Sequence, residues 1–483
     1  MSDSDDHNNP ESADPGGRPV GGTEYSWCKA VPTGTGITVL ALLLSKSPDI
    51  QLLENALHNL QNIHPILRSC LRFQTTTNSF SFVTPPNPHL QITVFDLSST
   101  SQIIHDDDNN HHVSPYHSIL QHELNQNAWH NPDPPSEMES KMFFVSVYAL
   151  SETQWAVVFR LHTAVCDRAS AVALLREVLK LIGESNGDGI EKEYEKRCEV
   201  SLGIEEYIPS GKANKPFWAR GVDMLGYSLN SFRLANINFV DANSPRYSQV
   251  VRLQMNPDDT ERLLSGCKSR GIKLCGALAA AGLIAARSSK QLPDHQTERY
   301  AVVTLIDCRS ILDPLLPNDQ LGFYHSAILN THDVSGDEEI WELAKRSYTA
   351  FENAKNSNKH FTDMSDLNYL MCKAIENPGL TPSSSMRTAF ISVFEDPVID
   401  ESNKLLLQKV GLEDYVGCSS AHGVGPSIAI FDTVRDGCLD CACVYPSPLH
   451  SREQMQGLID QMKTILVDGG SYLEEEEEEE GET

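Results

Sequence analysis

The sequence is poor in basic residues and contains no long apolar run. Its 483 residues include 38 lysines and arginines against 66 aspartates and glutamates, which gives a formal net charge of −28. A phosphate backbone or an anionic membrane surface would repel so acidic a chain, so neither nucleic acid nor membrane is expected as a partner. Apolar runs such as Ile37 to Leu44 are much shorter than the roughly 20 residues of a transmembrane helix, and they predict buried strands instead.

Cysteines are few and follow no regular spacing. The 12 cysteines are scattered along the chain, which is typical of reduced thiols in the cytosol rather than of a disulfide scaffold. The first twenty residues lack the apolar core of a secretion signal, so a cytoplasmic protein is expected. A monomer is expected as well. Cys438 and Cys441 form a C-x-x-C pair, but they follow the turn signal at Asp436 and Gly437 and lie in an alternating strand pattern. Small apolar filler fits that position better than a redox or metal site.

The motifs of nucleotide hydrolysis and redox catalysis are missing. No phosphate-binding Gly-rich loop, dinucleotide fingerprint or His-Glu-x-x-His pair occurs where a strand-turn-helix unit would support it. One segment is rich in His and Asp, namely His105, Asp106, Asp107, Asp108, His111, His112 and His117. It has no recognised ligand spacing, and a solvated loop is expected there. The sequence therefore predicts no metal site and no bound cofactor.

The length of the chain predicts two domains, because single cores stop growing at about 250 to 300 residues. Short apolar strands alternate with amphipathic helices in both halves, which predicts a mixed α/β (α+β) fold. The expected divisions are a disordered tail (residues 1–20), a first half (21–190), a crossover linker (191–245), a second half (246–468) and a disordered acidic tail (469–483). The last of these contains the run Glu474 to Glu480, and like charges at a terminus favour disorder.

Hydrophobic periodicity locates the elements within each half. In the first half it predicts strands at Thr38–Leu44, Leu90–Leu97, Met142–Leu150 and Gln154–Leu161, with helices at Leu52–Ile63, Tyr116–Trp129 and Ala171–Ile182. In the second half it predicts strands at Ser248–Met255, Tyr300–Asp307, Thr388–Phe394, Ser427–Val434 and Cys438–Tyr445. Helices are expected there at Asp258–Arg270, Leu274–Ala286, Glu338–Asn353 and Ser451–Leu466.

Residues 160–168 carry the most informative motif. They read Arg-Leu-His-Thr-Ala-Val-Cys-Asp-Arg, which resembles the acyl-transfer signature His-His-x-x-x-Asp-Gly with two positions changed. The signature belongs to the superfamily of the BAHD enzymes, alcohol acetyltransferases and condensation domains. Three further segments resemble segments of that superfamily and occur in the same order: Gly17–Tyr25, Leu57–Leu71 and Asp307–Gly322. The resemblance covers roughly residues 18 to 468, with the alcohol acetyltransferase branch the most similar. It implies two chloramphenicol-acetyltransferase-like halves that enclose a central tunnel.

The resemblance also assigns roles to the signature residues. His162 and Asp167 match the first His and the Asp of the motif, whereas Thr163 replaces the catalytic His and Arg168 replaces the Gly. The family implies that Asp167 pairs with Arg309 of the second half. From its place between a strand and a helix, Asp167 could equally be a helix N-cap. Arg168 would either narrow the approach of a pantetheine arm or bind a phosphate or carboxylate of the substrate.

Thr163 is a poor proton acceptor, so acyl transfer would need a base from elsewhere. His162 is adjacent but should face away from the tunnel, because neighbouring strand side chains point to opposite faces. His422, expected at a strand end of the second half, is the preferred candidate and His325 a third possibility, and each of these histidines could also have no role. Ser419 and Gly423 flank His422 and are expected, with Arg168 and His325, to contact substrate.

Two functions of different class remain open. The first is an acyltransferase that moves an acyl group from a thioester, expected to be acyl-CoA as co-substrate, to a hydroxyl or amine of a small metabolite. The second is a catalytically lapsed relative that binds a small molecule or a protein in the cleft between the halves. The altered signature leaves both open, because activity depends on the site rather than on the fold.

Overall fold

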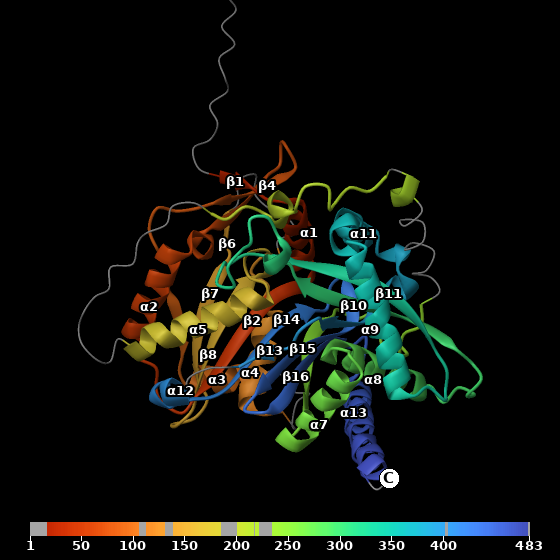
Figure 1. The fold of residues 1–483 in the computed structure, drawn as a ribbon. Coiled ribbons are helices and arrows are strands. Elements are labelled where there is room, and N and C mark those ends of the chain that lie inside the picture. The colour runs from red at the N-terminus through yellow and green to blue at the C-terminus, as the bar shows by residue number, and fades with distance from the viewer. Residues whose placement is uncertain are drawn as a thin grey trace, which may run out of the picture.

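The structure, a computed structural model, describes residues 17–105, 113–130, 139–184, 200–216, 218–221, 234–400 and 404–481. Two lobes, each a mixed sheet with flanking helices, lie side by side (Figure 1). The expected α/β architecture of two similar halves is therefore confirmed. The segment Asp106–His112 of the expected His/Asp-rich loop lies outside the described residues.

The first lobe is built on a five-stranded sheet of order β14-β2-β8-β7-β5. Its strands are β2 (Thr35–Leu44), β5 (Ile92–Phe95), β7 (Phe143–Ala149), β8 (Trp155–His162) and β14 (Leu412–Ala421). Helices α2 (Ile50–Ile63) and α5 (Arg168–Glu184) pack on this sheet and form a core with its apolar side chains. Helix α2 begins at the N-cap Asp49, whose side chain accepts a hydrogen bond from the Leu52 amide.

Strand β14 belongs to the first sheet although it comes from the second half of the sequence. It pairs antiparallel with β2, from Leu412 opposite Leu44 to Ala421 opposite Thr35. The short helix α12 (Lys404–Val410) precedes it and packs on α5. Hydrophobic periodicity did not predict the bounds of this strand, although His422 was expected at a strand end. The exchange brings the segment 412–421 next to the signature.

The second lobe contains a seven-stranded sheet in which β11-β10-β12-β15-β16-β9 form the main path and β13 pairs with β15. The strands are β9 (Tyr247–Gln254), β10 (Glu298–Asp307), β11 (His325–Val334), β12 (Arg387–Phe394), β13 (Val398–Ile399), β15 (Gly425–Arg435) and β16 (Cys438–Ser447). Its helices are α7 (Pro257–Ser269), α8 (Leu274–Ser288), α9 (Ile340–Asn356), α10 (Lys359–Thr362), α11 (Met364–Glu376) and α13 (Arg452–Gly481). Small residues of α8, among them Ala280, Ala281 and Ala285, are completely buried between the sheet and the neighbouring helices.

The two lobes share a buried apolar interface. Val39 and Ala41 of β2 lie in the same core cluster as Val250 of β9 and Val444 of β16. Helix α4 (Pro115–Asn125) adds Ile119, and its Tyr116 hydroxyl donates a hydrogen bond to the Ala41 carbonyl at 2.8 Å. The sheets are therefore held together by side chains of both halves and not only by the connecting chain.

The remaining elements complete the first lobe. A small sheet of order β1-β4-β3-β6 comprises β1 (Gly17–Pro19), β3 (Cys70–Gln74), β4 (Ser79–Val83) and β6 (Glu139–Lys141). Helices α1 (Gly22–Ala30) and α3 (Leu97–His105) complete the set. Helix α4 ends at Asn125 rather than at Trp129 as expected, because Asn127 turns to donate its side-chain amide to the Val31 and Pro32 carbonyls.

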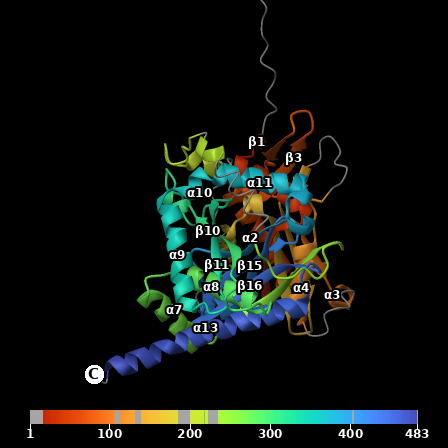
Figure 2. The same ribbon diagram turned by 90° about the vertical axis from the view of Figure 1, so that its right-hand side faces the viewer.

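Two further expectations differ from the structure. Helix α13 continues to Gly481, through residues where a disordered tail is expected, and projects beyond the rest of the fold (Figure 2). Gly469 and Gly470 are still buried, and the Trp341 indole donates a hydrogen bond to the Gly469 carbonyl at 2.9 Å, so packing extends the helix past residue 468. In the segment 191–245, expected as a crossover linker, Ile204 and Ile237 are buried in the second-lobe core.

Among the described residues no single helix is long and apolar enough to cross a membrane; only the bent pair α7 and α8 meets that criterion, by length and composition. The cysteines of the described ranges are free thiols, and no cluster of metal-ligating side chains occurs in those ranges. Cys438, Cys441 and Cys443 lie on β16, after a turn in which Asp436 and Gly437 both have positive φ.

Candidate functional site

Asp167 lies at the junction of β8 and α5 and is almost completely buried. Its Oδ1 accepts hydrogen bonds from the Ser170 amide at 2.8 Å and from Arg309 Nη2 at 3.0 Å. Both sequence interpretations of this residue therefore hold: it is the N-cap of α5, and it pairs with Arg309 from the opposite lobe. Burial raises the pKa of Asp167, but Arg309 and His325 lower it more strongly, so that its pKa lies well below the usual range.

A second set of donors reaches Asp167 from the segment that enters β11. Asp167 Oδ2 accepts a hydrogen bond from the Tyr324 amide at 2.8 Å and lies 3.0 Å from His325 Nδ1. The Gly322 carbonyl in turn accepts from the Asp167 amide at 3.0 Å. Gly322 has a φ of 150°, and a Cβ there would lie 2.6 Å from the Tyr324 ring, so this approach requires a glycine.

The pairing of β10 with β11 positions both second-lobe partners of Asp167. Asp307, the last residue of β10, lies opposite His325, the first residue of β11. Arg309 follows β10 directly and is fixed by Asp307 Oδ1 at 2.9 Å and by the Gln320 carbonyl at 3.0 Å. One strand register therefore brings a guanidinium and an imidazole to the same buried carboxylate.

The tautomer of His325 follows from the charge of Asp167. An ionised carboxylate can only accept hydrogen bonds, so the His325 Nδ1 must be the donor. In the neutral ring, the lone pair is then on Nε2. The pair has the arrangement by which a carboxylate orients a histidine as a general base in the Ser-His-Asp triad.

Thr163 takes part in a chain of buried hydroxyl groups. Its hydroxyl donates to the Gly36 carbonyl at 2.6 Å and lies 2.8 Å from Thr38 Oγ1, which lies 2.9 Å from Ser419 Oγ. Because the single Thr163 proton is committed to Gly36, Thr163 can only accept from Thr38. A Cβ at Gly36 would lie 3.1 Å from Thr163 Oγ1, which shows how closely the chain packs here. Thr163 and Ser419 therefore have structural partners that substrate would have to displace.

A central cavity of about 160 Å³ connects these groups. Thr163, Asp167, Arg168 and His325 line it together with Ser419, and most of its other lining is apolar. Side chains from α5, β12, β14 and β15 contribute to that lining, so both lobes form its wall. The expected space between the halves is present, and it contains an imidazole.

Of the three histidines considered in the sequence analysis, the structure brings only His325 to this cavity. His162 is completely buried on the other side of its strand, where its ring packs edge-on against Trp129 at 5.2 Å and Nδ1 accepts from the Ala164 amide at 3.1 Å. The expectation that it faces away is met, and the structure offers no support for a catalytic role.

His422, the preferred candidate, does not line the cavity. Its Nδ1 lies 2.9 Å from Ser248 Oγ, and its ring lies against Gly34, where a Cβ would come within 2.0 Å of Nε2. Burial, with Arg387 and Arg246 nearby, lowers the pKa of His422 to about 4. The strand β14 ends at Ala421, so the next residue turns away from the site.

Only two of the other expected substrate contacts line the cavity. Ser419 and Arg168 line the cavity, whereas Gly423 packs against Thr33, where a Cβ would lie 2.6 Å from the Thr33 carbonyl oxygen. Arg168 Nη2 lies 2.9 Å from Asp432 Oδ1. The guanidinium also donates to the main-chain carbonyls of Asp396 and Asp432, so its donors already have partners, which argues against the expected capture of a substrate phosphate or carboxylate.

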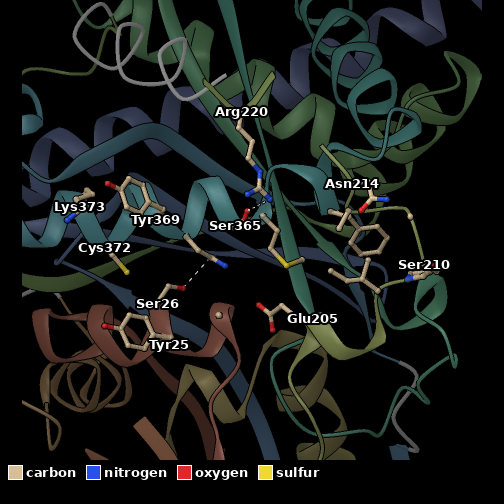
Figure 3. A pocket seen from close by; sticks show the side chains of 18 of the residues that line it. Tyr25, Ser26, Glu205, Ser210, Asn214, Arg220, Ser365, Tyr369, Cys372 and Lys373 are labelled. Atoms are coloured by element: carbon tan, nitrogen blue, oxygen red, sulfur yellow. Dashed lines mark hydrogen bonds between the residues drawn. The ribbon is translucent and has the colours of Figure 1, made fainter. Parts of the chain in front are cut away.

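A larger cavity, of about 590 Å³, lies between α1 and α11 (Figure 3). Tyr25 and Ser26 of α1 face it, and Ser26 Oγ lies 3.2 Å from Asn368 Oδ1. The next residue of α1, Trp27, lines the central cavity instead, so this helix is a wall of both. No histidine is among the described residues that line the larger cavity, which therefore lacks an imidazole base.

Acid should destabilise the protein through His162. Burial lowers the pKa of His162 to about 3, whereas the unfolded residue titrates near 6.5. Between these values only the unfolded state binds the proton, so stability falls with falling pH by up to about 1.4 kcal/mol per unit for this group. We expect His162→Asn, which retains an acceptor for the Ala164 amide, to flatten this dependence in urea unfolding measured from pH 7 to pH 4. Parallel curves for the two proteins would contradict the assignment.

Comparisons with known proteins agree with this architecture. Residues 244–354 match the family model described as phthiocerol/phthiodiolone dimycocerosyl transferase C-terminus. Polyketide synthase associated protein 5 from Mycobacterium tuberculosis is similar in structure over 94% of this chain and 98% of its own, with a TM-score of 0.63 and 16% identity. The fold of this chain is therefore the one found in that solved structure.

Two further solved structures, named for different activities, are similar in fold. The TRI3 trichothecene 15-O-acetyltransferase from Fusarium sporotrichioides is similar over 94% of both chains, with a TM-score of 0.69 and 12% identity. An epimerization domain of tyrocidine synthetase B is similar over 95% of this chain and 96% of its own, with a TM-score of 0.60 and 12% identity. No curated protein sequence matches this chain significantly. These similarities support acyl transfer in general, and the roles of individual residues have to be argued from the site.

Proposed function

We propose that this protein transfers an acyl group from acyl-CoA to a hydroxyl or amine of a small metabolite, with His325 as general base. The observation that carries the proposal is the hydrogen bond between His325 Nδ1 and buried Asp167, on the wall of the cavity that Thr163 also lines. The proton acceptor that the signature lacks would thus come from the opposite lobe. The catalytically lapsed alternative is less favoured, because it leaves this oriented imidazole without a role.

The reaction follows from the geometry of the pair. His325 Nε2 takes the proton of the acceptor hydroxyl or amine as that atom attacks the thioester carbonyl carbon. Ionised Asp167 stabilises the imidazolium that forms, without taking up a proton itself. When the tetrahedral intermediate collapses, the C–S bond breaks and His325 returns the proton to the departing thiolate. The histidine therefore acts first as a base and then as an acid.

The remaining lining supports an acyl substrate. Leu40, Leu175 and Phe431 give the cavity an apolar wall suited to a hydrocarbon group rather than to a charged one. The similarity to acyltransferases supports a thioester donor, and free CoA is the leaving group proposed here.

The direct test is incubation of the purified protein with acyl-CoA thioesters and a mixed panel of alcohols and amines, with release of free thiol as the readout. We expect thiol release that depends on acceptor and protein and is accompanied by an acylated product identified by mass. A protein that binds acyl-CoA but releases no thiol with any acceptor would favour the lapsed alternative.

Thr163 should be dispensable for the chemistry. We expect Thr163→Val to reduce kcat/KM less than tenfold, because the hydroxyl donates to Gly36 and does not accept the substrate proton. It should reduce the free energy of unfolding by about 1 to 3 kcal/mol, since the Gly36 carbonyl and Thr38 lose a buried partner. Steady-state kinetics and urea unfolding of the same preparation test both statements. A rate loss of several hundredfold without unfolding would instead make Thr163 part of the catalytic machinery.

A further inference from the structure

Arg168 connects the two lobes at one side of the central cavity. It is the first residue of α5, and its guanidinium lies 2.9 Å from Asp432 Oδ1 of β15 and donates to the Asp396 carbonyl at 3.1 Å. It also donates to the main-chain carbonyl of Asp432. Only 11% of the Arg168 side chain and 1% of the Asp432 side chain are exposed, so a fixed cation fills the gap between α5 and the second sheet.

An aromatic wall leads from His325 to this cation. The Phe394 ring lies 5.8 Å from the His325 ring, edge-on, and 4.2 Å from Arg168 Cζ. Phe431 extends the wall, with its ring 5.4 Å from that of Phe394. The side chains of His325, Phe394, Phe431 and Arg168 all line the cavity, whereas Asp432 does not. The Phe394 ring therefore separates the proposed base from the guanidinium.

The side of the cavity between His325 and Arg168 is apolar, and we name it the acyl arm. Besides the two Phe rings, Val172 and Leu175 of α5 also line the cavity. A hydrocarbon chain that extends from His325 along the Phe394 ring would meet the Arg168 guanidinium.

We propose that the Arg168–Asp432 pair ends the acyl arm and restricts this protein to short acyl groups. The proposal rests on the proposed acyl-CoA function for the nature of the ligand, but it concerns the length of the acyl arm and not the catalytic step. Arg168 is thus a specificity-determining residue rather than a catalytic one. The two residues have to be replaced together, because Asp432 without its cation would be an uncompensated buried carboxylate.

Two double variants separate the size of residue 168 from its charge. Arg168→Gly with Asp432→Asn empties the end of the acyl arm, and Arg168→Met with Asp432→Asn keeps a side chain of similar length. Neither leaves a buried charge unpaired, and only residue 168 differs between them. Thermal unfolding checks that each double variant is folded before its binding is compared.

Binding of the unreactive thioethers S-ethyl-CoA and S-hexyl-CoA, measured by calorimetry, tests the acyl arm without requiring turnover. We expect the wild type and the Met variant to prefer the ethyl compound by at least about tenfold, and the Gly variant to lose or invert that preference. Equal preference in the Gly and Met variants, or failure of the wild type to bind either thioether, would overturn the inference. Selective binding of S-ethyl-CoA with no turnover of acetyl-CoA would leave the acyl arm standing and reject the proposed catalytic function.

Discussion

Replacing His325 with glutamine should reduce acyl transfer by about 10²- to 10⁴-fold, the usual cost of losing a general base. The glutamine amide can still donate to Asp167 Oδ2, but it cannot accept a proton from the acceptor substrate. The loss should fall mainly on kcat, because the imidazole acts on the reacting proton rather than on the binding of the acyl group. Thiol release from the acyl-CoA that the wild type uses best gives the measurement.

A half-buried histidine outside the cavity provides the matched control. His422→Gln replaces an imidazole that is bonded to Ser248 and does not line the cavity. We expect this variant to keep most of the wild-type turnover, in contrast to His325→Gln. A reversed order, with His422 essential and His325 dispensable, would show that the base reaches the substrate from β14 and would reject the proposed mechanism.

Replacing Arg309 with methionine should reduce the free energy of unfolding by about 3 to 5 kcal/mol, the cost of removing one partner of a buried ion pair. The side chains of both Arg309 and Asp167 are only 1% exposed, so solvent cannot replace the lost guanidinium. Tyr324 and His325 would remain as donors to Asp167, but the Oδ1 would keep only the Ser170 amide. Urea unfolding followed by fluorescence and by circular dichroism measures the effect.

An exposed ion pair of the same lobe serves as the control. Arg299 pairs with Asp333 at 2.7 Å, but these side chains are 45% and 54% exposed. Arg299→Met should therefore cost no more than about 1 kcal/mol. Equal losses in the two variants would mean that Arg309 does not brace the signature from the opposite lobe.

Local sequence patterns predicted most of the secondary structure. The strands at 38–44 and 154–161 occur as β2 and β8 because both of their faces are apolar and buried, and the helix after residue 168 occurs as α5 because one apolar face packs on the sheet. Strand β14 escaped prediction because it includes Glu413 and Asp414 and finds its partner β2 about 370 residues earlier in the chain. No local periodicity encodes so distant a pairing.

The site was predicted in part. The contact between Asp167 and Arg309 was implied by the superfamily resemblance, and the N-cap role followed from the position of Asp167 between a strand and a helix. The choice of His422 over His325 as base finds no support in the structure, because only His325 lines the cavity, and sequence does not tell which residue of a strand end faces it. The segment Gly322-Phe-Tyr-His325 offers a candidate base, but only the register of β10 with β11 shows that the His325 imidazole meets Asp167.

Chemical rescue of His325→Ala by free imidazole tests most directly whether the proton acceptor comes from the second lobe. The account predicts that the variant is nearly inactive and that turnover returns in proportion to the concentration of neutral imidazole, while the wild type is unaffected. An active His325→Ala variant, or an inactive and folded one that imidazole fails to rescue at any concentration, would contradict it.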